Sequence, residues 1–257
     1  MNAPESFVAW LANHRHVDRK YHHTYKYHPR SDAHSIALCT FIVEDLLKEC
    51  DILRAQAARG EIAYGVNVEH AWPNGKRKTI DIALGQPRAS DLAASKIPGI
   101  GRANSFERVF VSGEAKTVMT EHKKSQPRIF DELSSSHEIV HQGTQEAIAA
   151  GIAVLNIADS FVSPLRQKSR KNLVVTKHRQ PDVAASMVNH LRGLPIRNSI
   201  GQVGFDAYCT VVVECDNQAT AKLWTDAPAP QPGDPDHYDT FVRRIARFYA
   251  ERFAVFL

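Results

Sequence analysis

Apolar residues recur with helical spacing in several parts of the chain. Between residues 32 and 59, Ile36, Cys39, Val43 and Leu46 repeat on one side, with Ser31 or Asp32 as a cap and Gly60 as a stop. We therefore predict one long helix over 32–59. The same spacing, with Pro near the start and polar caps, predicts further helices over 125–142, 181–193 and 237–253 and a short one near 6–14.

Runs of β-branched and aromatic residues separate these helical segments. Two such runs, 61–72 and 78–85, flank Pro73, Asn74 and Gly75, and Asn-Gly between strand-like runs predicts a hairpin. The remaining apolar runs predict strands over 107–116, 150–159 and 204–216. Helices that alternate with strands in this order predict an α/β fold, with a mixed central sheet covered by helices on both sides.

The segment 86–105 is rich in Pro, Gly, Ala and Ser and has no clean period. We read it as an insertion loop, with at most a short helix over 90–96. A second connector, rich in Pro, covers 228–235. Nothing marks a second domain, so we expect a single domain over residues 1–257.

Composition narrows the class of protein. The 257 residues are 43% hydrophobic and 23% charged, as in ordinary globular proteins. No apolar run is long enough to span a bilayer, so no membrane partner is expected. The N-terminus lacks a basic start followed by an apolar block, and the four cysteines lie in apolar segments without C-x-x-C spacing. We therefore expect reduced core thiols and a cytoplasmic protein.

The net charge of +4 matters less than its distribution. Basic side chains cluster at 15–30, 74–78, 121–128, 166–172 and 176–179. The first cluster mixes bases with tyrosine, so we interpret residues 1–31 as a basic N-terminal arm that could follow a nucleic-acid backbone. Solvated loops are the other interpretation of all these clusters.

One strand ends in a pattern that a buried strand does not need. In SGEAK, Glu114 and Lys116 are two positions apart and so point to the same face. Asp81 interrupts the apolar run of KTIDIALG upstream. Burying such a carboxylate is costly without a cation or hydrogen bonds. A divalent ion between the two acids would offset that cost, and the lysine could position or help to deprotonate its water. A structural ion pair is the alternative.

An Asp followed on the next strand by Glu-x-Lys, after a long helix and a hairpin, resembles the PD-(D/E)xK nuclease superfamily, which includes the restriction endonucleases. The resemblance covers residues 32–158 and implies a restriction endonuclease-like core. It also implies that Asp81, Glu114 and the Ala115 carbonyl hold Mg²⁺ and that Lys116 is the catalytic lysine. Members often add an acid from the first helix, for which Glu44 is favoured over Glu49. The sequence has Ile80 where the family has proline, and the spacing from Asp81 to Glu114 requires the insertion.

The resemblance implies a function as well. We expect a Mg²⁺-dependent endonuclease of restriction type that cuts double-stranded DNA to 5′-phosphate and 3′-hydroxyl ends and acts as a homodimer. Basic residues directly after the catalytic strand, together with one on the hairpin, are expected to hold phosphates: Lys123, Lys124, Arg128 and Lys78.

Two other functions remain open. HEIVH matches the H-E-x-x-H pattern, in which His137 and His141 would bind zinc and Glu138 would act as base. The surrounding residues are polar and no third ligand stands out. The basic clusters also fit a DNA-binding protein without catalytic activity.

Overall fold

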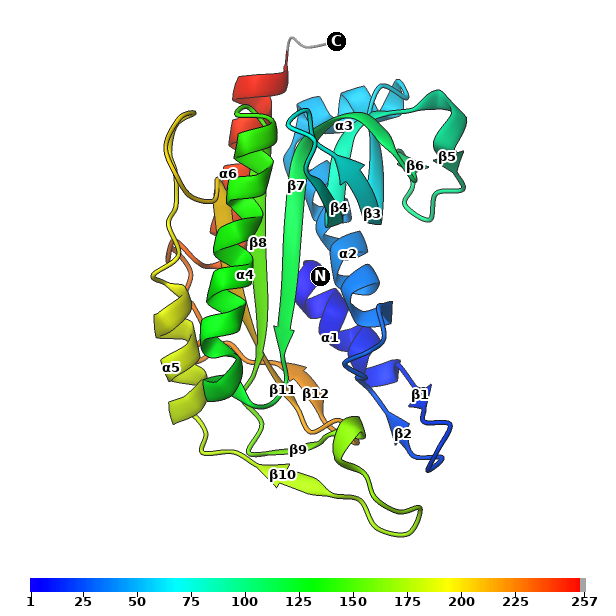
Figure 1. The fold of residues 1–257 in the computed structure, drawn as a ribbon, viewed down its shortest axis with the longest axis vertical. Helices are drawn as coiled ribbons and strands as arrows, with labels where there is room; N and C mark the ends of the chain where they lie inside the picture. Colours follow the sequence, from blue (N-terminus) through cyan, green and yellow to red (C-terminus); the bar gives the residue numbers. More distant parts are fainter. Residues whose placement is uncertain (255–257) are drawn as a thin grey trace.

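The computed structural model describes residues 1–254, and its centre is a mixed sheet of eight strands (Figure 1). Three neighbours, β3, β4 and β7, run antiparallel, whereas β7, β8 and β11 run parallel. In spatial order the strands are β12 (Ala221–Leu223), β11 (Ala207–Cys215), β8 (Ile148–Asn156), β7 (Phe106–Val118), β4 (Arg77–Pro87), β3 (Ala63–Ala71), β6 (Gly101–Ala103) and β5 (Leu92–Ala93). The predicted α/β class and mixed sheet are confirmed.

Six helices among the described residues flank the sheet, and each face has its own hydrophobic core. Four of them pack on one face: α1 (Ala3–Asn13), α2 (Ala33–Glu49), α3 (Asp51–Ala58) and α6 (Tyr238–Phe253). The other face carries α4 (His122–Gly143) and α5 (Asp182–Leu191), which contact each other as well as the sheet. The parallel strands are joined through α4 and α5, so the sheet is buried on both sides (Figure 1).

Two small hairpins lie outside the main sheet. One pairs β1 (His16–Val17) with β2 (Thr24–Tyr25), and the other pairs β9 (Ser160–Val162) with β10 (Val175–Lys177). Short 3-10 turns, η1 (Ala89–Asp91) and η2 (Pro164–Arg166), complete the described elements. In Figure 1 both hairpins lie at the same end of the molecule, below the end of β7.

The helix predicted over 32–59 is two helices. Cys50 has an extended backbone between α2 and α3, and no glycine or proline marks this break. The reason is tertiary: α3 turns to pack on α6, where Gln56 donates to the Phe253 carbonyl and accepts from the Tyr249 hydroxyl. Tertiary contacts therefore override an unbroken helical period.

Two other segments differ in detail from the sequence-based expectation. The segment 86–105, read as a loop, contains η1, the edge strand β5 and its neighbour β6, and it forms no α-helix at 90–96. The first half of the expected basic arm is the helix α1, whose Phe7 and Leu11 are buried against the core. The basic stretch that follows α1 forms the β1–β2 hairpin.

The structure confirms the predicted hairpin turn and the prediction that the cysteines are reduced core thiols. Trp72 donates to the Lys76 carbonyl across the β3–β4 turn, and Gly75 has a positive φ of 81°. The four cysteines are free and buried. None of the helices within residues 1–254 has the length and apolar character needed to cross a bilayer.

Candidate active site

The two acids singled out in the sequence meet where β4 and β7 part. The pairing of β4 with β7 ends at Ile82–Gly113, so Asp81 and Glu114 are the first residues past the ladder. Ile80 and Ile82 belong to different hydrophobic cores, although residues two apart in a regular strand share a face. The strand is therefore irregular at Asp81, and its carboxylate leaves the normal alternation.

The neighbouring strand is irregular at the same level. Asn67 lies opposite Asp81 in the β3–β4 register, has a positive φ of 53° and belongs to no regular residue pair. Asparagine tolerates this left-handed conformation better than most residues with a side chain. The sheet thus bends at both strands at the level of Asp81.

Asp81 is tied directly to β7. Its Oδ2 accepts a hydrogen bond from the Ala115 backbone N–H at 2.7 Å. Burial, and then the nearby negative charge of Glu114, raise the pKa of Asp81 to about 6, although that hydrogen bond and the ammonium groups of Lys116 and Lys78 oppose the rise. The two carboxylates therefore repel each other across the gap between the strands.

Glu114 is the centre of an ion-pair cluster. It is only 8% exposed, and its Oε1 lies 2.7 Å from the Lys116 Nζ. Its Oε2 lies 2.8 Å from the Lys78 Nζ and also accepts the Ser136 hydroxyl at 3.4 Å. Because both oxygens are paired, this buried charge is compensated, as burial requires.

Lys116 bridges two acids from different elements. Besides Glu114 it contacts Glu132 of α4 at 3.1 Å, and Glu132 is paired with Arg128 at 2.7 Å. Burial alone would lower the pKa of Lys116, but the two carboxylates outweigh it and raise that pKa. The ammonium therefore stays charged and is suited to donate hydrogen bonds rather than to accept a proton.

The donor set at Asp81 and Glu114 fits a hard divalent cation. Mg²⁺ takes oxygen ligands and uses one or two carboxylates with waters and substrate phosphate. A cation between the two carboxylates would relieve the repulsion that raises the pKa of Asp81. Within residues 1–254 no group of three or more His, Cys, Asp or Glu side chains could hold a metal, so protein ligands here are limited to this pair and backbone carbonyls such as that of Ala115.

Neither Glu44 nor Glu49, the acids expected on the first helix, forms a three-ligand group with this pair within residues 1–254. Cys39 of α2 lies near both acids, because burial and then the charges of Asp81 and Glu114 raise the pKa of its thiol. Glu44 lies five positions after Cys39, so its side chain leaves the helix about 140° around the axis from that of Cys39. Glu49 lies at the end of α2, where it lines a cavity beside Tyr238.

The predicted phosphate-binding residues divide into two groups. Lys78 belongs to the ion-pair cluster, because its ammonium pairs with Glu114. Lys123 and Lys124 are exposed in the first turn of α4 and line a cavity of about 380 Å³. Lys177, the last residue of β10, and Arg179, two positions after it, line the same cavity.

Arg128 lies between the acids and this basic end. It lines a smaller cavity of about 180 Å³, which is also lined by Thr117, the residue after Lys116. Its ion pair with Glu132 continues the chain of contacts that starts at Glu114. Sequence reasoning missed Glu132 and Ser136, for which only their spacing of four on α4 was a signal.

The HEIVH residues do not form a hydrolytic site. His137 is buried and neither of its ring nitrogens has a hydrogen-bond partner, whereas Glu138 is exposed. His141 contacts Asp206 at 3.1 Å, and Asp206 is already paired with the fully buried Arg197. Glu138 therefore lies away from the two histidines that it would serve as base.

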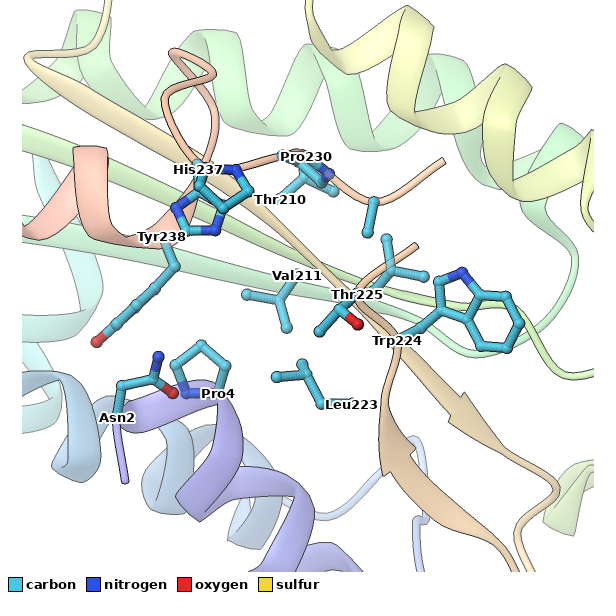
Figure 2. Close-up of a pocket in the computed structure, with 13 residues that line it drawn as sticks. Asn2, Pro4, Thr210, Val211, Leu223, Trp224, Thr225, Pro230, His237 and Tyr238 are labelled. Atoms are coloured by element: carbon cyan, nitrogen blue, oxygen red, sulfur yellow. The ribbon is translucent and has the colours of Figure 1, made fainter. Parts of the chain in front are cut away.

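A further cavity lies at the far edge of the sheet (Figure 2). It has a volume of about 130 Å³. Figure 2 shows Asn2 and Pro4, at the start of α1, facing Val211 and Leu223 of the sheet. No Asp, Glu, Lys or Arg lines this cavity, so it contributes nothing to the acid cluster.

Comparison with known proteins gives no match: no family model, no curated protein and no solved structure matches this chain.

Proposed function

We propose that this protein is a Mg²⁺-dependent DNA endonuclease of restriction type, built on a restriction endonuclease-like core. The observation that supports this most is the convergence of Asp81, Glu114 and Lys116 where β4 and β7 separate. A structural ion pair needs one acid and one base. The second carboxylate, held close enough to raise the pKa of Asp81, is left unexplained by that alternative.

Each residue has a chemical role in the proposal. Asp81 and Glu114 hold the divalent ion, together with the Ala115 carbonyl. When bound, Mg²⁺ supplies Lewis-acid stabilisation of the negative charge that builds on the phosphate during hydrolysis. Lys116 donates hydrogen bonds, because its raised pKa keeps it protonated. It therefore orients the attacking water or a phosphate oxygen rather than removing a proton.

The proposed substrate is double-stranded DNA. Lys123, Lys124 and Arg128 follow the catalytic strand within one helix and would contact phosphates, which gives affinity and position rather than sequence choice. Lys177 and Arg179, across the cavity from α4, extend this basic surface. A homodimer, in which each copy cuts one strand of a palindromic target, belongs to the proposal.

The alternatives have less support. A zinc hydrolase needs Glu138 beside His137 and His141, but Glu138 is exposed while both histidines are buried. A DNA-binding protein without activity would need only the basic surface. It would have no use for two acids held together inside the fold against their mutual repulsion.

Cleavage of supercoiled plasmid DNA tests the proposal. With Mg²⁺, the wild-type protein is expected to give nicked and linear products whose ends DNA ligase can rejoin, as 5′-phosphates require. Asp81→Ala and Lys116→Met are each expected to slow cleavage at least about 100-fold. Asp131→Ala, which alters an exposed acid of α4, is the matched control and should cut normally. Wild-type cutting rates in both site variants would refute the assignment.

A further inference from the structure

Lys78 has a place in the site that the catalytic scheme does not use. Its ammonium lies 2.8 Å from the Glu114 Oε2 and donates to the Ser136 hydroxyl at 2.5 Å. Its side chain is 14% exposed, so the charge is largely withdrawn from solvent. A lysine whose only task was to contact DNA phosphates would project outward. Lys78 instead points at a proposed metal ligand.

The two lysines on Glu114 are not equivalent. Lys116 also pairs with Glu132. This second carboxylate would still hold the Lys116 ammonium if Glu114 bound another cation. Lys78 makes its direct contacts with Glu114 and the neutral Ser136 hydroxyl, and no second carboxylate among the described residues forms an ion pair with it. Of the two ammonium groups, Lys78 is therefore the one that yields its position on Glu114 at lower cost.

We propose that Lys78 is a positioning residue that competes with the divalent cation for Glu114 and thereby limits metal affinity. The proposal rests on the proposed function, because it takes Asp81 and Glu114 as the metal ligands. An ammonium at Oε2 occupies an oxygen donor and places a positive charge beside a carboxylate that would hold the ion. Without that charge, the carboxylates of Asp81 and Glu114 are balanced only by the ammonium of Lys116, so the pair attracts a divalent cation more strongly.

The test is calorimetric titration of Mn²⁺ into the protein without DNA, for wild type and Lys78→Met. Lys78→Met is expected to bind Mn²⁺ about tenfold more tightly or better. Lys76→Met is the matched control, because Lys76 lies on the same hairpin but is exposed and contacts Gln142. Its Mn²⁺ affinity should equal that of the wild type.

If Lys78 had a purely structural role, its replacement would change the Mn²⁺ affinity in the opposite direction. Loss of an anchor for Glu114 would loosen the site and weaken Mn²⁺ binding, so unchanged or weaker binding by Lys78→Met would overturn the proposal. Lys78→Gln removes the charge but keeps a hydrogen-bonding group at the end of the side chain. It should also bind more tightly, and it serves as the test if Lys78→Met fails to fold.

The outcomes separate this inference from the proposed function. If wild-type protein binds one Mn²⁺ and neither Lys78 variant binds it more tightly, the competition is wrong and the metal site stands. If neither wild type nor the Lys78 variants bind Mn²⁺, the metal site itself is wrong and the competition fails with it.

Discussion

Asp81 carries an energetic cost that its surroundings only partly offset. Its pKa is raised to about 6 by burial and by Glu114, above the ordinary 3.8 of an aspartate. Below about pH 4 the carboxyl is protonated in the folded and the unfolded chain, so it costs nothing. Between about pH 4 and pH 6 the unfolded chain has lost this proton while the folded chain keeps it, so the free energy of unfolding falls across that range; it levels off above pH 6, where the folded chain also holds the charge.

Asp81→Asn should therefore stabilise the protein at neutral pH. The amide oxygen can still accept the Ala115 N–H, and no charge is buried. We expect the free energy of unfolding at pH 8 to rise by about 1–3 kcal/mol. The gain should vanish at pH 4, which urea unfolding at the two pH values measures. A variant less stable than wild type at pH 8 would contradict this account.

The residues of the acid pair could be found from sequence because their types are out of place there. An Asp inside KTIDIALG and a Glu-x-Lys after ERVFV are polar interruptions of buried strands. The ion pairs that surround the two acids could not be found in this way. Lys78 and Glu132 are ordinary surface types, and only the fold brings them to Glu114 and Lys116.

At the scale of elements, the position of the acids depends on the irregular pairing of β4 with β7. The register shifts between Leu84 and Gly85, and a methyl group on Gly85 would overlap the Arg108 carbonyl oxygen of the partner strand. Glycine at this position thus permits the close approach of β4 and β7. That approach sets the register of the two strands, and with it the positions of Asp81 and Glu114.

Gly85→Ala should disturb this pairing. We expect a loss of about 2–3 kcal/mol in the free energy of unfolding, because backbone atoms of two central strands must separate. Gly101→Ala in β6 is the control. A methyl group there meets its neighbours at ordinary contact distances of 3.8 and 3.9 Å, so stability should change little. Equal stability of the two variants in urea unfolding would show that the close approach is unimportant.

Element prediction succeeded where local signals and tertiary structure agree. Asn74 and Gly75 defined the β3–β4 turn, and apolar runs defined the strands. The break at Cys50 could not be predicted, because it arises from contacts of α3 with α6 nearly 200 positions away. The strands β5 and β6 are only two and three residues long, too short for any hydrophobic period to reveal.

At the scale of the whole molecule, a buried charge network joins distant elements. Asp206 is fully buried and is held by Arg197, Arg252 and His141, which come from a loop, α6 and α4. Burial alone would raise the pKa of Asp206, but the hydrogen bonds from these three side chains outweigh it and hold that pKa at about 2. Asp206 is thus the shared acceptor that ties the two helical layers to the end of the sheet.

Asp206→Asn should destabilise the protein strongly. It leaves the fully buried Arg197 without a counter-charge, and breaking a buried pair in this way costs about 3–5 kcal/mol. Asp182→Ala, which removes the exposed partner of Arg179, should cost less than about 1 kcal/mol. Urea unfolding of both variants measures the difference, and a cost for Asp206→Asn no larger than that of the surface pair would contradict the role of the network.

The long-range arrangement is what the sequence could not supply. The sequence revealed separate basic clusters, but it did not reveal that residues from 121–128 and from 176–179 line one cavity. It also offered HEIVH as a zinc motif, because a local pattern does not reveal that Arg197 and Asp206 already surround His141. Such contacts depend on how layers stack, which local patterns do not encode.

The claim that Asp81 and Glu114 together bind one divalent ion is tested most directly by the stoichiometry and affinity of Mn²⁺ in calorimetric titration of wild type, Asp81→Asn and Glu114→Gln. The account predicts one ion per chain for the wild type and at least about tenfold weaker binding for each variant. Binding to both variants with the affinity of the wild type would show that the two carboxylates do not hold the metal.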